Sequence, residues 1–106
     1  MIPKKVRTTN SSIPKQYRSQ MQILGDILDA TMQGGREGCR ISNISRKANL
    51  SHYTVLEKCN KLISAGLVEP GNHDRYRIFM VTEKGLDFIR EFRRFQGLVE
   101  SMNFRY

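Results

Sequence analysis

The stretch that decides the fold is residues 42–66, SNISRKANLSHYTVLEKCNKLISAG. Ser42 is predicted to cap a short helix over residues 43–48, because a serine hydroxyl accepts a hydrogen bond from the free amide groups at a helix start. A tight turn is expected at Asn49, since asparagine tolerates the left-handed backbone conformation. The first half of the stretch is therefore interpreted as a short helix that ends in a turn.

The second half of the stretch predicts a longer helix over residues 52–65, with Ser51 as its cap and Gly66 at its end. Apolar residues recur on it at the spacing of one helical face. This expected buried stripe consists of Val55, Leu56, Cys59, Leu62 and Ile63. The outward residues near its start are His52, Tyr53, Thr54, Glu57, Lys58 and Lys61. Two helices joined by so short a turn are typical of a helix-turn-helix, whose second helix enters the major groove of DNA.

The flanking segments complete the order of elements. The other expected elements are a helix over residues 17–33, a bridging strand over 39–41, a two-stranded hairpin over 67–81 and a helix over 83–102. The apolar stripe predicted for the helix over residues 17–33 is Tyr17, Met21, Leu24 and Leu28, with Ile23 and Ile27 alongside. Turn-forming residues occupy 70–75, and Thr82 is expected to cap the last helix. The fold class is therefore α+β and mostly α.

Charge favours a polyanionic partner, nucleic acid before an anionic membrane surface. The chain holds 18 basic and 10 acidic residues, which gives a net charge of +8. Residues 1–16 are predicted to form a flexible basic arm, since they are rich in small polar residues and prolines. Lys4, Lys5 and Arg7 then either follow a DNA minor groove or only keep the chain soluble, and both interpretations stay open.

Several classes of function are excluded by the motifs that are missing. No apolar stretch reaches the roughly 18 residues of a membrane span, and the N-terminal lysines are followed by no apolar run, so we expect no secretory signal there. Cys39 and Cys59 are expected to be reduced thiols, and their spacing to the two histidines matches no zinc site. The sequence has no glycine-rich phosphate loop and no recognisable catalytic triad. We therefore expect a binding protein of the cytoplasm, associated with the nucleoid, that is not an enzyme and has no metal or cofactor.

The sequence resembles winged helix-turn-helix transcriptional regulators, and most of all small archaeal winged-helix DNA-binding proteins. The resemblance lies in residues 44–51, 55–62, 67–69 and 76–85, and it extends from about Tyr17 to the C-terminus. In such proteins the second helix of the motif reads DNA and the wing, which is the hairpin, contacts flanking DNA. The DNA-binding residues that this resemblance implies are His52, Tyr53, Thr54, Lys58 and Lys61 on the second helix of the motif, His73, Arg75 and Arg77 on the wing, and Arg46 and Lys47 on the short helix over residues 43–48.

One departure from the family pattern bears on sequence specificity. The expected recognition helix carries two lysines and no arginine, although arginine makes the commonest specific contact with guanine. An architectural protein that coats DNA with little sequence preference is therefore an alternative to a regulator. A winged-helix module that binds proteins instead of DNA is a second alternative, because fold alone does not define function.

The C-terminal helix carries a heptad pattern. Its apolar residues alternate at spacings of four and three, which is typical of a coiled-coil seam. The seam residues are Phe88, Phe92, Phe95, Val99 and Met102. Leu86 and Ile89 lie off this line and are expected to pack on the domain. Residues 83–106 are therefore predicted to form a homodimer, although a helix that folds back would instead make the seam part of the chain's own core.

The predicted organisation has three parts, which are the arm over residues 1–16, a winged helix-turn-helix domain over 17–82 and a dimerisation helix over 83–106. The predicted partners are double-stranded DNA and a second copy of the chain, and no membrane. The main functional hypothesis is a homodimeric transcriptional regulator.

Overall fold

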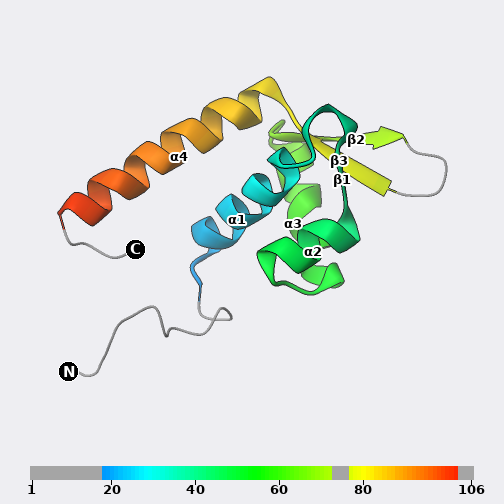
Figure 1. Cartoon of the computed structure of the whole chain (residues 1–106), viewed down its shortest axis with the longest axis horizontal. Coiled ribbons are helices and arrows are strands. Elements are labelled where there is room, and N and C mark those ends of the chain that lie inside the picture. The colour runs from blue at the N-terminus through cyan, green and yellow to red at the C-terminus, as the bar shows by residue number, and fades with distance from the viewer. Residues whose placement is uncertain (1–17, 73–76, 103–106) are drawn as a thin grey trace.

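The computed structural model describes residues 18–72 and 77–102 of the chain. Its elements are α1 (Gln20–Met32), the 3-10 helix η2 (Gly35–Glu37), β1 (Cys39–Arg40), α2 (Ile41–Ala48), α3 (His52–Ser64), β2 (Val68–Asn72), β3 (Arg77–Val81) and α4 (Glu83–Ser101). Figure 1 shows α1, α2 and α3 gathered beside a small sheet, while α4 extends away from it. The α+β, mostly helical fold class predicted from the sequence is confirmed.

Local capping signals explain where most helices begin. The Ser51 hydroxyl accepts a hydrogen bond at the start of α3, and the Thr82 hydroxyl does the same for α4, as predicted. The prediction for Ser42 is wrong, because α2 already begins at Ile41. The chain passes directly from β1 into this helix, so that Ser42 lies inside the first turn rather than before it.

The turn and the helix end in the decisive stretch are confirmed. Asn49 has a φ of 57°, the left-handed conformation expected after α2. Gly66 has a φ of 79° and ends α3, where the Leu67 amide donates to the Leu62 carbonyl at 2.9 Å and the Gly66 amide donates to the Ile63 carbonyl at 3.0 Å. This pair of hydrogen bonds is the Schellman arrangement, which satisfies the last carbonyl groups of the helix.

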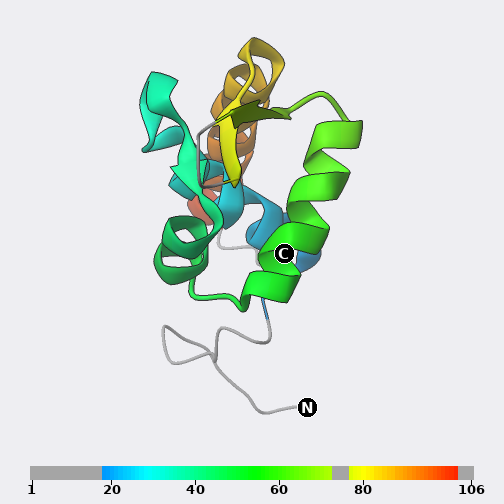
Figure 2. The ribbon, with the colours of Figure 1, turned by 90° about the vertical axis from the view of Figure 1, so that its right-hand side faces the viewer.

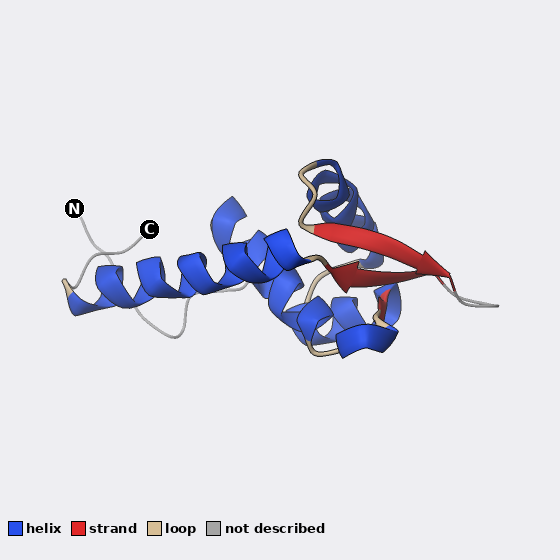
Figure 3. Cartoon of the chain, turned by 90° about the horizontal axis from the view of Figure 1, so that it is seen from above, coloured by secondary structure: helices blue, strands red, loops and turns tan. Residues whose placement is uncertain are grey.

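The sheet is antiparallel with the strand order β1-β3-β2. The wing is the β2–β3 pair, and β1 adds a third strand through the pairing of Cys39 with Phe79. The prediction that a turn begins at Pro70 is wrong, because β2 continues through Pro70 and Gly71 to Asn72. A proline is tolerated there because β2 is an edge strand of this sheet. Figure 3 shows the two long strands, β2 and β3, lying beside each other.

The core lies between α1, α2, α3 and one face of the sheet. The stripe predicted for α3 is confirmed, with Leu56 and Ile63 at its partly buried edges. The stripe predicted for α1 is wrong at Met21, which is exposed, and Tyr17 lies outside the described residues. The buried face of α1 contains Ile23, Gly25, Ile27, Leu28, Ala30 and Thr31, so the prediction holds for Ile23, Ile27 and Leu28. The apolar spacing predicted the helix correctly but included the exposed Met21 in its buried face.

The first half of α4 packs against α1. Ile89 is buried as predicted, and a Cβ atom on Gly25 would lie only 2.3 Å from the Phe92 ring. The Phe88 and Phe92 rings stack with their centroids 6.2 Å apart, and Phe88 packs against the core. This half of the predicted seam is therefore intramolecular. Leu86 was expected to pack on the domain but is 40% exposed.

The second half of α4 is different. Phe95 is 50% exposed, Leu98 55% and Met102 45%, whereas Val99 is buried.

Among the helices in the described part of the chain, none is long and apolar enough to cross a membrane.

Candidate nucleic-acid interface

The start of α3 presents an exposed polar surface. His52 and Lys61 are exposed, Tyr53 is 76% exposed and Thr54 is partly buried. α3 buries its other face in the core through Val55 and its neighbours on the stripe, so this polar surface is not needed for packing. Figure 2 shows α2 and the start of α3 joined by a short turn at the lower side of the domain in that view. The predicted surface residues of α3 are thus brought together, with one exception.

The exception is Lys58, whose predicted outward position is wrong. This residue is 8% exposed, and its Nζ atom donates to Oε1 of Gln20 on α1 at 2.7 Å. The nearest oxygen of the Glu57 carboxylate lies 4.0 Å from the same Nζ atom. Because a lysine has a long aliphatic stem, it can cover apolar surface and still place its amine on a polar partner. Lys58 therefore joins α3 to α1.

Hydroxyl groups organise the N-terminus of α3. The Ser51 hydroxyl accepts from the Thr54 amide at 3.1 Å and donates to the Thr54 hydroxyl at 2.9 Å. The Thr54 hydroxyl keeps its own hydrogen as a donor. Free amide groups and the helix dipole make this end of α3 partly positive, which suits a phosphate or a base acceptor.

The turn between α2 and α3 is held by side chains that sequence reasoning did not single out. One guanidinium nitrogen of Arg18 donates to the Asn49 carbonyl at 3.2 Å, and another pairs with the Asp26 carboxylate on α1. The Ser45 hydroxyl donates to the Leu50 carbonyl across the same turn. These bonds fix the start of α3 relative to α1. The bond from Arg18 to Asn49 could not be predicted from spacing, since it joins residues 31 positions apart in the chain.

Exposed basic residues also lie on α2 and on the wing. Arg46 and Lys47 are exposed in the last turn of α2, and Arg46 donates to the Asn43 side chain at 3.0 Å. Arg77 is exposed on β3, with its guanidinium carbon 5.7 Å from the centroid of the Phe79 ring. The remaining predicted DNA-binding residues lie outside the described residues. They are Lys4, Lys5, Arg7, His73 and Arg75.

The two cysteines are part of the core. Cys39 and Cys59 are both buried, and burial raises the pKa of each thiol, that of Cys59 to about 11. Neither is therefore a thiolate at neutral pH, and thiolates are the reactive form. Within residues 18–72 and 77–102, no three histidine, cysteine or acidic residues gather as metal ligands would.

Comparison with known proteins agrees with this geometry. A family model described as winged helix-turn-helix matches residues 17–100. The fold is similar to that of Sso10a-2, a DNA-binding protein from Sulfolobus solfataricus, with a TM-score of 0.70 and 22% identity over 81% of this chain and 86% of that one. It is also similar to AF1382 from Archaeoglobus fulgidus, with a TM-score of 0.65 and 21% identity over 80% of this chain and 94% of that one.

A third similar structure is the DNA complex of MepR from Staphylococcus aureus. The TM-score is 0.64, with 15% identity over 76% of this chain and 68% of MepR. A search of curated proteins by sequence finds no match. Identities this low establish the shared fold and leave the ligand to be argued from the residues of this chain.

Proposed function

Because the chain belongs to the winged helix-turn-helix family, we propose that it binds double-stranded DNA and regulates transcription by occupying its site. In this proposal α3 enters the major groove, and the wing contacts flanking DNA. The observation that carries it is the exposed polar start of α3, together with exposed basic side chains on α2 and on β3 of the wing. The major groove is about 12 Å wide, and a helix can enter it only if one face of the helix is not packed against the protein.

The exposed side chains divide into two groups by chemistry. Lys61, Arg46, Lys47 and Arg77 carry full positive charges and suit phosphate contacts, which supply affinity without sequence preference. The uncharged donors and acceptors near the helix start suit base edges. They are His52, Tyr53 and Thr54. Base readout would therefore depend on the first turn of α3.

Assembly as a homodimer is part of the proposal. Phe95, Leu98 and Met102 follow one another at spacings of three and four, so they lie on one face of α4, and each is about half exposed. A second copy that packs on this face would remove large apolar side chains from water. A symmetric dimer would also present two copies of α3 to half-sites about one DNA turn apart.

A specific observation favours the architectural alternative. With Lys58 turned toward Gln20, Lys61 is the cation that α3 still exposes, and α3 carries no arginine. Arginine, which makes the commonest specific contact to guanine, is therefore missing from this helix. A DNA-coating protein with little sequence preference would need only the phosphate contacts.

Binding to duplex DNA across a salt series tests these functions against one another. Fluorescence anisotropy would be measured with random duplexes and with a duplex selected from a random pool. We expect log affinity to fall with log salt by about 0.9 for each phosphate contacted. Tighter binding of the selected duplex supports a regulator, and equal binding supports the architectural alternative. If the protein shows no salt-dependent binding to either duplex, a DNA function is contradicted and the protein-interaction module remains.

A further inference from the structure

One arginine joins α1 to the turn that precedes α3. Arg18 lies just before α1, and its side chain is only 10% exposed. One guanidinium nitrogen pairs with the Asp26 carboxylate, and another donates to the Asn49 carbonyl at 3.2 Å. Asn49 is the residue at the end of α2, where the partial negative charge of the helix end favours a cation. Arg18 therefore ties the α2–α3 turn to α1.

Asp26 holds this arginine in place. The Asp26 side chain is 25% exposed, and its second carboxylate oxygen accepts from the Gln22 side chain at 2.8 Å. The Gln22 side chain in turn accepts from the Gln96 side chain on α4 at 3.2 Å. An arginine side chain has many rotamers, so a fixed carboxylate is needed to keep its guanidinium in one orientation. The Asp26 carboxylate is supported by α1 and, through Gln22, by α4.

The turn that Arg18 holds sets the position of the proposed DNA surface. The Asn49 carbonyl lies two residues before Ser51, whose hydroxyl caps α3. The first turn of α3 follows directly and carries the side chains that we assign to base edges. A binding surface is effective only when supporting bonds hold its residues close to the productive geometry. A movement of this turn would therefore change how the start of α3 meets a groove.

We propose that Asp26 is a positioning residue for DNA binding, which acts through Arg18 and Asn49 on the start of α3. This role rests on the proposed function, and its expected effect is opposite in sign to that of simple electrostatics. Removal of a negative charge should by itself strengthen the attraction of a protein to a polyanion. Removal of the Asp26 charge should instead weaken DNA binding, because Arg18 loses the partner that holds it on the turn.

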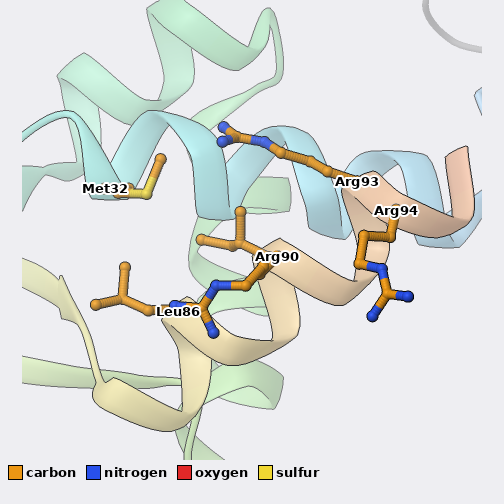
Figure 4. Close-up of a pocket in the computed structure, with 6 residues that line it drawn as sticks. Met32, Leu86, Arg90, Arg93 and Arg94 are labelled. Carbon is orange, nitrogen blue, oxygen red and sulfur yellow. The ribbon is translucent and has the colours of Figure 1, made fainter. Parts of the chain in front are cut away.

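Asp29 provides a matched control on the same helix. It lies three residues after Asp26, but its partner is Arg93 on α4, at 2.6 Å. Figure 4 shows the Arg93 side chain extending from α4 toward α1. Asp26→Asn and Asp29→Asn therefore remove the same charge from the same helix, and only the first removes a partner of Arg18.

The test is fluorescence anisotropy with a short random duplex in a salt series, on the full chain and both variants. We expect Asp26→Asn to bind at least about threefold more weakly than the wild type, with an unchanged salt slope because no phosphate contact is lost. Asp29→Asn should bind as tightly as the wild type or more tightly. If both variants behave alike, the positioning role is overturned and the proposed function stands. A wild type that binds no duplex would overturn the proposed function, and this role with it.

A second variant keeps the charge of the chain constant. Arg18→Lys preserves the positive charge, but an ammonium lacks the planar fork with which an arginine bonds two partners at once. It should therefore weaken DNA binding as Asp26→Asn does. Without DNA, ¹⁵N NMR of Asp26→Asn should show shifted amides at residues 49–51, whereas Asp29→Asn should leave them in place. Thermal melts confirm that each variant is folded, and unshifted turn amides or full affinity of Arg18→Lys would overturn the role.

Discussion

α3 and α4 are both capped, amphipathic helices, yet they bury their apolar faces in different ways. All of α3 lies against the domain, so that its apolar stripe is covered and its polar face is free for a ligand. α4 has 19 residues against the 13 of α3, and its first half packs on the domain through Ile89 and Phe92, while Val99 is the buried apolar residue of its second half. Its second half leaves Phe95 and Met102 about half exposed. The same pattern therefore completes a core in one helix and offers an interface in the other.

The largest expected effect breaks the second half of α4. Phe95→Glu should convert a dimer into a monomer while preserving helical content, because Phe95 is already half exposed within its own chain. Burying the exposed half of Phe95 on both sides of a two-fold axis contributes about 1.5–3 kcal/mol, so the dimer Kd should rise at least about tenfold. Sedimentation at matched concentrations measures this change.

A matched variant on the same helix serves as the control. Leu86→Glu places the same charge on the opposite face of α4, where it should leave the dimer intact. A wild type that is monomeric, or a Phe95→Glu variant that remains dimeric, would refute the dimer contact on this face.

An intermediate effect compares two glycines of α4. A Cβ atom on Gly85 would lie 2.1 Å from the backbone oxygen of Leu67, so Gly85→Ala should lower the free energy of unfolding by about 1–3 kcal/mol. Gly97 has no atom within 4 Å of such a Cβ, and Gly97→Ala should raise it by about 0.5–1 kcal/mol, since glycine weakens a helix interior. Urea denaturation measures both values. Two changes of the same sign would show that the halves of α4 are not supported differently.

The smallest effect distinguishes two lysines of α3. Lys61→Ala should reduce the salt dependence of DNA binding by about one phosphate contact, a slope change of about 0.9. Lys58→Met should leave that slope unchanged and lower stability instead by about 1 kcal/mol, because it loses the bond to Gln20 but keeps the buried stem. Anisotropy in a salt series reports the first effect and urea denaturation the second. If Lys58→Met reduces the salt dependence and Lys61→Ala lowers the stability, the inward position of Lys58 is contradicted.

Signals that act over a few residues were enough to predict the helix-turn-helix. Ser51, Asn49 and Gly66 each determine the local backbone through their own side chain or through its absence, so the turn and both ends of α3 follow from sequence. The apolar stripe of α3 was equally predictable because its whole length faces one core.

Features that depend on distant partners were not predictable in this way. Lys58 turns inward only because α1 places Gln20 beside it, and Pro70 belongs to a strand only because β2 is an edge. The heptad on α4 has the same spacing whether Phe92 meets Gly25 or Phe95 meets another molecule. For the candidate site, sequence supplied the chemistry of the residues, and the fold decided which of them are exposed.

The central claim is that the start of α3 is the surface that meets DNA. The most direct measurement is NMR of the ¹⁵N-labelled protein during titration with a short random duplex at low salt. We predict that the largest amide shifts occur at residues 51–57, with smaller ones at residues 46–47 and 77, while the amide of Leu86 on α4 does not shift. Shifts concentrated on α4, or none under conditions where anisotropy detects binding, would contradict the account.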